Sequence, residues 1–257
     1  MHKIKHFFSK VSNIFKNLKL TTPVAIILGA LIIAGGLMGY GVIISGGVSS
    51  VTTAGDPLPK ILKGVGVNKS AFIKCVDSGE RAQAVTDSIN DGIKAGVNGT
   101  PATFILREEA GVLYIVNNIS GAQDENFFKQ SIEQAINLTD VSKLTKFVGK
   151  VVDQNELQEM TNPTKVFVVE YSDAECPYCT RLHPTLKKIR TDYAGRISFV
   201  YRNFPLVQIH QHAQKEAEMI SCIGKLGGAK AYYPFIDAIF DYKINNNAPY
   251  IPYTAGK

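Results

Sequence analysis

Val166-Phe-Val-Val-Glu-Tyr-Ser-Asp-Ala-Glu-Cys-Pro-Tyr-Cys-Thr180 is the stretch that decides the fold of this chain. Its apolar, β-branched first half predicts a buried strand, and a short turn separates this strand from a helix that begins at Cys176-Pro-Tyr-Cys179. A cysteine at a helix N-terminus lies beside unpaired N–H groups and the positive end of the helix dipole, which favour its thiolate. The second cysteine follows one turn later and can close a disulfide with the first. We therefore expect a redox-active dithiol at a strand-to-helix turn.

The length and charge of the chain limit the classes of function. At 257 residues, with 45% hydrophobic residues, it can bury a substantial core as one large domain or two small ones. Most of the net charge of +6 lies in the first twenty residues, which contain no acid. The lysines of that segment are Lys3, Lys5, Lys10, Lys16 and Lys19. The rest of the chain is close to neutral and shows no basic stripe interleaved with aromatic residues, so we do not expect nucleic-acid binding.

The N-terminal region has the pattern of a membrane anchor. No charged residue lies between Lys19 and Asp56, and residues 22–46 are almost wholly apolar or Gly, which is long enough to cross a bilayer. We predict a cytoplasmic basic amphipathic segment over residues 1–21, a transmembrane helix over 22–46 and a tether over 47–57. The lysines precede the apolar run, so the chain would pass the cell membrane once with its N-terminus in the cytoplasm. A cleaved signal peptide is the alternative, although its apolar region would be shorter.

The number of cysteines is consistent with a domain on the oxidising side of a membrane. Cys176 and Cys179 form the CxxC pair, which leaves Cys75 and Cys222 far apart in the sequence. Because the number is even, this second pair could form a structural disulfide, and two buried free thiols are the alternative.

The rest of the chain alternates helical and strand patterns, which indicates an α/β fold class. Two blocks carry these patterns, residues 58–137 and residues 164–257, and a polar stretch over residues 138–163 predicts a linker between them. The first block predicts helices over 58–64, 70–75 and 78–95, strands over 102–106 and 112–116 with a turn over 108–111, and a helix from Asp124 to about 136. The second block predicts strands over 166–171 and 197–201 and helices over 176–190, 209–223 and 229–240.

Helical periodicity in the first block also predicts which side chains face inward. They are Ala82, Val85, Ile89 and Ile93 in one helix and Phe127, Phe128, Ile132, Ala135 and Ile136 in the other.

The two blocks resemble the two halves of the DsbA-like thiol–disulfide oxidoreductases, which have a thioredoxin fold with a helical insertion. Residues 170–179 and Phe199-Val-Tyr-Arg-Asn-Phe-Pro205 are similar to the first half of that fold. Gly96-Val-Asn-Gly-Thr-Pro-Ala-Thr-Phe-Ile-Leu106 and the helix after Gly121 are similar to its second half. In the family the CxxC half comes first, whereas here it comes second. We therefore expect a thioredoxin-like fold whose halves stand in circularly permuted order, and a domain-swapped dimer or a fragment of a longer tandem protein are the alternatives.

The resemblance implies roles for five residues. Cys176 would be the exposed sulfur that substrates attack, and Cys179 the resolving thiol. Pro101 matches the family's cis-proline, which faces the dithiol, and Thr100 before it would touch the cysteine sulfur; an ordinary trans turn proline is the alternative. Glu170 matches a buried acid that assists proton transfer to the inner cysteine, and a glutamate exposed at a sheet edge is the alternative.

We expect an extracytoplasmic enzyme that donates disulfides to the thiols of unfolded or partly folded secreted proteins and needs no cofactor. The resemblance implies recycling by a quinone-linked membrane oxidase. Tyr178 stands where strongly oxidising members have His, so a disulfide isomerase or reductase is an alternative within the class. A metal- or copper-binding module that uses Cys176, Cys179 and His183 is the alternative from another class.

Overall fold

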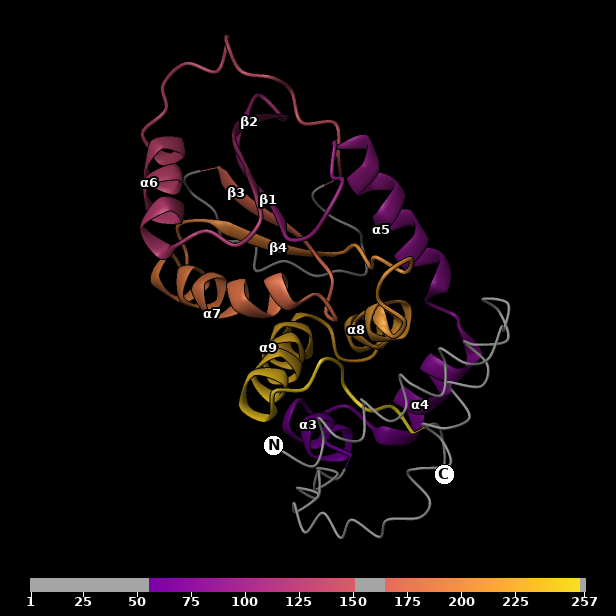
Figure 1. Cartoon of the computed structure of the whole chain (residues 1–257). Helices are drawn as coiled ribbons and strands as arrows, with labels where there is room; N and C mark the ends of the chain where they lie inside the picture. The colour runs from indigo at the N-terminus through magenta and orange to yellow at the C-terminus, as the bar shows by residue number, and fades with distance from the viewer. Residues whose placement is uncertain (1–55, 151–164, 255–257) are drawn as a thin grey trace, which may run out of the picture. The chain divides into compact units, whose positions relative to one another are not determined.

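A mixed four-stranded sheet organises residues 56–150 and 165–254, which are the residues that the computed structural model describes (Figure 1). β1 (Ala102–Glu109) and β2 (Val112–Ser120) form an antiparallel hairpin. β1 also pairs antiparallel with β3 (Val166–Ser172), and β3 pairs parallel with β4 (Ser198–Asn203). The strand order is β2-β1-β3-β4, so the contact between β1 and β3 joins the two separated sequence blocks within one chain.

The strands run longer than the sequence predicts. β1 continues to Glu109, and the turn consists of Ala110 and Gly111 alone. Both turn residues have positive φ, 49° and 78°, which suits the tight turn of a two-residue hairpin. β3 is buried along its whole length, as expected for a strand in the middle of a sheet that helices cover on both faces.

Helices cover both faces of the sheet (Figure 1). α6 (Glu125–Ile136) and α7 (Pro177–Asp192) pack on one face, which carries side chains such as Ile105 and Val168. α9 (Ala229–Asn246) reaches the same face at β4, where Tyr233 donates to the Phe199 carbonyl. α5 (Ala82–Lys94) packs on the other face, against Tyr171 and Phe204. This arrangement of a mixed sheet with helices fits a thioredoxin-like fold.

A helical cluster combines both ends of the described chain. α3 (Leu58–Gly64) and α4 (Lys69–Ser78) come from the first block, and α8 (Ala213–Gly227) and α9 come from the second. A disulfide between Cys75 in α4 and Cys222 in α8 joins residues 147 positions apart, with their Cα atoms 6.0 Å from each other.

Two predicted inward-facing residues point outward. Ile93 is 59% exposed and Phe127 is 40% exposed, so these predictions are wrong. In α5 the buried face consists instead of Val85, Ser88, Asp91 and Gly92. The reason is close packing: a Cβ atom on Gly92 would lie 2.7 Å from the Phe204 ring, so α5 turns its small residues toward the sheet.

Two predicted helix boundaries are also wrong. Ser78 ends α4, and Gly79 follows in the left-handed conformation (φ 66°) that commonly stops a helix. α5 therefore starts at Ala82 and does not use Ser78 as its cap. The helix predicted from residue 209 begins at Ala213, because residues 204–212 form an irregular loop in the structure.

The described part of the predicted linker belongs to the fold. Ile115 donates its N–H to the Thr145 carbonyl, and Phe147 donates to the Leu113 carbonyl, each at 2.8 Å. The Phe147 ring lies 5.1 Å from that of Phe104 in the core. The segment thus covers the outer edge of β2, which would otherwise leave backbone groups unpaired.

The predicted anchor lies outside the described residues, as do residues 1–55 as a whole and residues 151–164. Among the helices that the structure describes, none combines the length and apolar character required to cross a bilayer.

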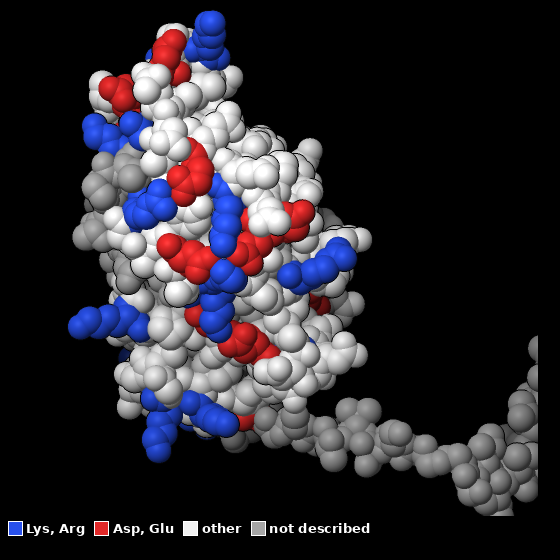
Figure 2. Space-filling view, turned by 90° about the vertical axis from the view of Figure 1, so that its left-hand side faces the viewer, with Lys and Arg blue, Asp and Glu red and all other residues white. Residues whose placement is uncertain are grey.

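The outer face of α6 and α7 carries paired charges. Figure 2 shows Lys and acidic side chains alternating over this face. Lys129 lies 2.6 Å from Glu125 and 3.0 Å from Asp192, and Lys188 contacts the same two acids. These pairs are exposed, so each contributes little to stability.

A buried ion pair links the helical cluster to the turn before α7. Lys243 Nζ lies 2.7 Å from Glu216 Oε2 and donates to the Ala174 carbonyl at 2.5 Å. Glu216 Oε1 accepts the backbone N–H of Ile251 at 2.7 Å. Both side chains are fully buried, so burial raises the pKa of Glu216 and lowers the pKa of Lys243. Each charge therefore depends on the other for its stability.

We predict that Lys243→Ala lowers the free energy of unfolding by about 3–5 kcal/mol, because it leaves a buried carboxylate without its partner. Lys225→Ala is the matched control, since Lys225 pairs with Glu80 at the surface and should contribute about 1 kcal/mol or less. Urea denaturation of both variants measures the difference. Equal losses in the two variants would contradict this account of the buried pair.

Candidate active site

The dithiol lies where the sequence predicts it, between the end of β3 and the start of α7. Cys176 is the N-cap residue of α7, with φ −68° and ψ 125°, and Pro177 occupies the first helical position. Proline suits that position because its missing N–H would have no partner inside the helix. Cys176 therefore lies at the positive end of the helix dipole.

The Thr100–Pro101 loop lies against Cys176. The Cys176 Sγ is 3.5 Å from the Thr100 carbonyl oxygen, although the two residues are 76 positions apart in the sequence. The peptide bond between Thr100 and Pro101 is cis. The loop leads directly into β1, so the pairing of β1 with β3 places it at the dithiol.

The pKa values of the two cysteines are shifted in opposite directions. The Cys179 thiol donates a hydrogen bond to the Cys176 sulfur, which is the main reason why the pKa of Cys176 is lowered to about 5. Backbone N–H groups of Tyr178 and Cys179 add to this effect. Burial raises the pKa of Cys179 well above its usual value, and the nearby Cys176 sulfur raises it further. The pair thus consists of one thiolate and one thiol near neutral pH.

Cys176 is less exposed than the sequence predicts. The residue is only 3% exposed, because the Thr100–Pro101 loop packs against it, so the expectation of an exposed sulfur is wrong for this structure. The neighbouring Tyr178 is 56% exposed, and the Arg181 guanidinium lies over its ring at 4.9 Å.

Glu170 is buried in the middle of the sheet, so the alternative of a glutamate exposed at a sheet edge is wrong. It is 2% exposed and stands in register with Thr103 of β1 and Tyr201 of β4. Burial raises the pKa of Glu170 to about 7, and this rise is partly offset by Ser172 and by the positive charge of Arg190. The carboxyl group can therefore gain or lose a proton near neutral pH.

Asp173 holds the turn that carries the dithiol, a role that the sequence analysis missed. Its carboxylate accepts the backbone N–H groups of Glu175 and Leu206, each at 2.8 Å, and lies 2.6 Å from Nδ1 of His210. An Asp that bonds to the N–H two residues later is a common turn device, so the local signal was present. The contacts with Leu206 and His210 are long-range and have no sequence signal.

His183 contacts side chains of α9. Its ring stacks on Phe240 with centroids 4.4 Å apart, and its Nε2 lies 3.1 Å from Asp237 Oδ1. Over residues 56–150 and 165–254, His, Cys, Asp and Glu side chains form no group of three or more suited to a metal ion.

A groove of about 640 Å³ adjoins the dithiol. Pro177, Arg181 and Pro184 of α7 line one wall. Ile244 at the end of α9 and Pro249 beyond it line the other wall. The groove has room for an extended polypeptide segment beside the CxxC turn.

Two family models match separate parts of the chain. A DSBA-like thioredoxin domain model matches residues 48–133, and a thioredoxin model matches residues 161–250. Together they support a DsbA-like protein of the thioredoxin superfamily. The first match contains Thr100 and Pro101, and the second contains the CxxC motif.

Some curated proteins share a short segment with this chain. A segment of 62 residues is 42% identical to Na(+)/H(+) antiporter NhaA 1 of Salinispora arenicola and 39% identical to Na(+)/H(+) antiporter NhaA 3 of Salinispora tropica. Each match covers 24% of this chain and only 9% of the antiporter. No solved structure matches the chain.

The low pKa of Cys176 gives a measurable pH dependence. We predict that the ultraviolet absorbance of the thiolate in the reduced protein titrates with a midpoint near pH 5, against about 8.5 for an ordinary cysteine. Because the folded pKa lies below the unfolded one, the thiolate stabilises the reduced protein above the unfolded pKa. This contribution is lost as the pH falls toward 5.

Two variants check the assignment of this titration. Cys176→Ser should abolish it, and Cys179→Ala should raise its midpoint because the hydrogen bond from the Cys179 thiol is removed. A midpoint near 8.5 in the unaltered protein would show that Cys176 has no special environment.

Proposed function

We propose that this protein is an extracytoplasmic thiol–disulfide oxidoreductase that donates disulfides to other proteins through Cys176 and Cys179. The observation that carries the proposal is the meeting of the CxxC turn with the Thr100–Pro101 loop, in which Cys176 Sγ and the Thr100 carbonyl oxygen are 3.5 Å apart. Such a loop offers backbone groups beside the reactive sulfur, and a substrate chain can pair with them by adding an extended segment.

The reaction begins with the oxidised protein. A substrate thiolate attacks the Cys176 sulfur, the bond between Cys176 and Cys179 breaks, and Cys179 leaves as a thiolate that takes up a proton. A second thiolate of the substrate then attacks the substrate sulfur of this mixed disulfide, and Cys176 leaves as a thiolate. The substrate gains a disulfide, and the protein keeps the two electrons as a dithiol.

The direction of exchange follows from the stability of the leaving group. A cysteine with a pKa of about 5 leaves readily and stabilises the reduced form of the protein, which favours oxidation of the substrate. Tyr178 between the two cysteines supports the alternatives of an isomerase or a reductase, because the resembled oxidases have His there. The pKa of Cys176 leads us to prefer the oxidase.

The substrates and the cellular setting are part of the proposal. The groove beside Pro177 suits the unfolded or partly folded chains of secreted proteins as substrates. The sequence pattern of residues 22–46 supports a single membrane anchor, and the disulfide between Cys75 and Cys222 suits an oxidising compartment. A quinone-linked membrane oxidase as the recycling partner rests on the family resemblance alone.

We also propose that the two halves of the fold are circularly permuted. β1 of the first block pairs with β3 of the second within one chain, which supports this order over a domain-swapped dimer. The ends of the described chain also lie together, since Thr254 Oγ1 donates to Asp56 Oδ2 at 3.3 Å. If those ends were joined by a short link and the chain were opened between the two blocks, the two halves would follow the order of the resembled family.

The exchange mechanism predicts opposite behaviour for the two cysteine variants. With an unfolded substrate protein that contains a disulfide, Cys179→Ser should accumulate a mixed disulfide that non-reducing electrophoresis detects, because the Cys176 thiolate attacks the substrate disulfide and the resolving thiol is absent. Cys176→Ser should form no adduct and show no oxidase activity. The reduction potential of the dithiol tests the direction: a value near thioredoxin's, about −270 mV, would rule out the oxidase.

If the two halves are circularly permuted, the chain should tolerate a change in the position of its termini. A variant that joins Thr254 to Asp56 by a short Gly/Ser linker and opens the chain between Lys150 and Lys165 should keep its exchange activity. Its free energy of unfolding should change by only about 1–2 kcal/mol, since only loop closure is altered. Failure of a folded, monomeric variant to exchange disulfides would contradict the proposed arrangement.

A further inference from the structure

Three neighbouring strands place polar side chains in one row behind the dithiol. Thr103 of β1, Glu170 of β3 and Tyr201 of β4 are in register, so their side chains point to the same face of the sheet. Tyr201 belongs to the core cluster on the face that α7 covers. Ser172 follows Glu170 by two residues on β3 and therefore points to this face as well. The row thus begins beneath α7 and ends near its first turn, where Cys179 lies.

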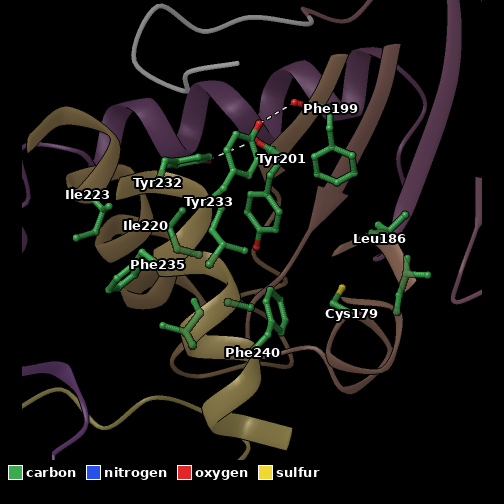
Figure 3. Packing of buried hydrophobic residues seen from close by; sticks show 14 of the residues in the cluster. Cys179, Leu186, Phe199, Tyr201, Ile220, Ile223, Tyr232, Tyr233, Phe235 and Phe240 are labelled. Carbon is green, nitrogen blue, oxygen red and sulfur yellow. Dashed lines mark hydrogen bonds between the residues drawn. The ribbon is translucent and has the colours of Figure 1, made fainter. Parts of the chain in front are cut away.

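Three hydroxyl groups of this row, those of Thr103, Ser172 and Tyr201, are buried without a hydrogen bond among the described residues. Ser172 and Tyr201 are each 1% exposed, and neither hydroxyl has a hydrogen-bond partner among the residues that the structure describes. In Figure 3 the Tyr201 hydroxyl points away from the strand, toward Phe240 and Cys179. Leaving a buried hydroxyl unpaired is unfavourable, so the presence of two such groups beside a reactive sulfur indicates a function for them.

The Ser172 hydroxyl lies between the groups that exchange protons. It is near enough to Glu170, Cys179 and Tyr201 to lower the pKa of each of them, although none of these contacts meets hydrogen-bond geometry in the dithiol form. A rotation of one hydroxyl can therefore make or break the connection.

Water has no room in the part of this connection that Glu170 and Tyr201 line. The space enclosed by α7, α9 and the sheet beside Glu170 is too narrow for a water molecule. Its lining on the α7 side carries His183, Lys187 and Arg190, and on the α9 side Tyr233. Arg190 pairs with Asp237 of α9 and Lys187 pairs with Asp241, and His183 also lies against Asp237, so these groups already have partners. Side-chain hydroxyls remain to carry a proton through this region.

We propose that Ser172 and Tyr201 relay the proton between Glu170 and Cys179 during disulfide exchange. The inference rests on the proposed exchange reaction and adds two residues to it. When Cys179 leaves as a thiolate, a hydroxyl of the relay donates its proton to the sulfur and takes a proton from the Glu170 carboxyl group. The step starts from a thiolate and a carboxylic acid and ends with a thiol and a carboxylate, so no other reactant is needed.

The proton affinities give this transfer its direction. Burial holds the pKa of Cys179 well above its usual value, whereas the pKa of Glu170 is about 7, so the proton moves from the carboxyl group to the sulfur. Burial and the nearby charges of Glu170 and Cys179 raise the pKa of Tyr201, which therefore stays protonated and acts as a hydrogen-bonding hydroxyl. Resolution of a mixed disulfide by Cys179 uses the same path in reverse.

Removal of each hydroxyl tests the relay. We expect Ser172→Ala and Tyr201→Phe, in the full chain, to slow the release of a peptide thiol from a preformed mixed disulfide with Cys176 about 10-fold. We expect the double variant to slow it no further than the more affected single variant, because both hydroxyls belong to one path of proton transfer. Stopped-flow rates against pH should also lose the limb near pH 7 that Glu170 produces in the unaltered protein. Both hydroxyls are unpaired, so their removal should leave the fold intact.

Tyr232→Phe is the matched control. Tyr232 is also buried, and its hydroxyl donates to the backbone carbonyl of Tyr201 at 3.3 Å, so its loss affects stability but removes no hydroxyl of the relay. This variant should keep the rate and the limb near pH 7. If Tyr201→Phe and Ser172→Ala keep them too, the relay is overturned.

Glu170→Gln separates a proton path from a general packing effect. It should remove the limb near pH 7, and adding Tyr201→Phe to it should then slow the reaction no further, because both changes interrupt one path. Additive losses would contradict the relay. If the unaltered protein forms no mixed disulfide with the peptide, the proposed function itself fails, and this outcome differs from any result of the hydroxyl variants.

Discussion

The antiparallel pairing of β1 with β3 is the constraint on which the site depends. It sets Ala102 opposite Tyr171, and Pro101 immediately before Ala102 thereby reaches the turn that follows β3. The CxxC motif by itself specifies only a dithiol at a helix start. The backbone ladder between two strands more than fifty residues apart adds the loop at its side, and it also sets Thr103 beside Glu170. A shift of one residue in this ladder would turn Glu170 and Ser172 to the opposite face, away from Cys179.

Burial determines the pKa values of Cys179 and Glu170 but not that of Cys176. At Cys176 the helix start and the thiol of Cys179 supply hydrogen bonds that outweigh burial, and the pKa of Cys176 falls. At Cys179 and Glu170 burial is the largest influence, and both pKa values rise. A single turn of helix therefore separates a sulfur that readily holds negative charge from one that resists it. This asymmetry makes one sulfur the leaving group for substrates and the other the acceptor of a proton.

Sequence reasoning was most successful where the signal is local. The buried strand before Cys176, the helix start at Pro177 and the Asp124 cap all depend on neighbours within a few residues, and the structure contains each of them. The outward positions of Ile93 and Phe127 were missed because packing against distant residues, and not periodicity alone, decides how a helix is rotated. Phe147 was missed because a polar composition suggested a linker, whereas its neighbours in space are Phe104 and Leu113.

The supports of the dithiol turn show why part of the site has no sequence signal. Lys243 is a lone basic residue near the end of a helix, and Glu216 stands among polar neighbours in α8, so each would ordinarily be assigned to a solvated surface. Their burial follows from the helical cluster, in which α8 and α9 enclose the Ala174 carbonyl and leave the cation as its donor. The cluster draws α3 and α4 from one end of the described chain and α8 and α9 from the other. The position of the dithiol turn therefore depends on contacts that exist only in the assembled fold. The motif itself indicates only the chemistry of the two sulfurs.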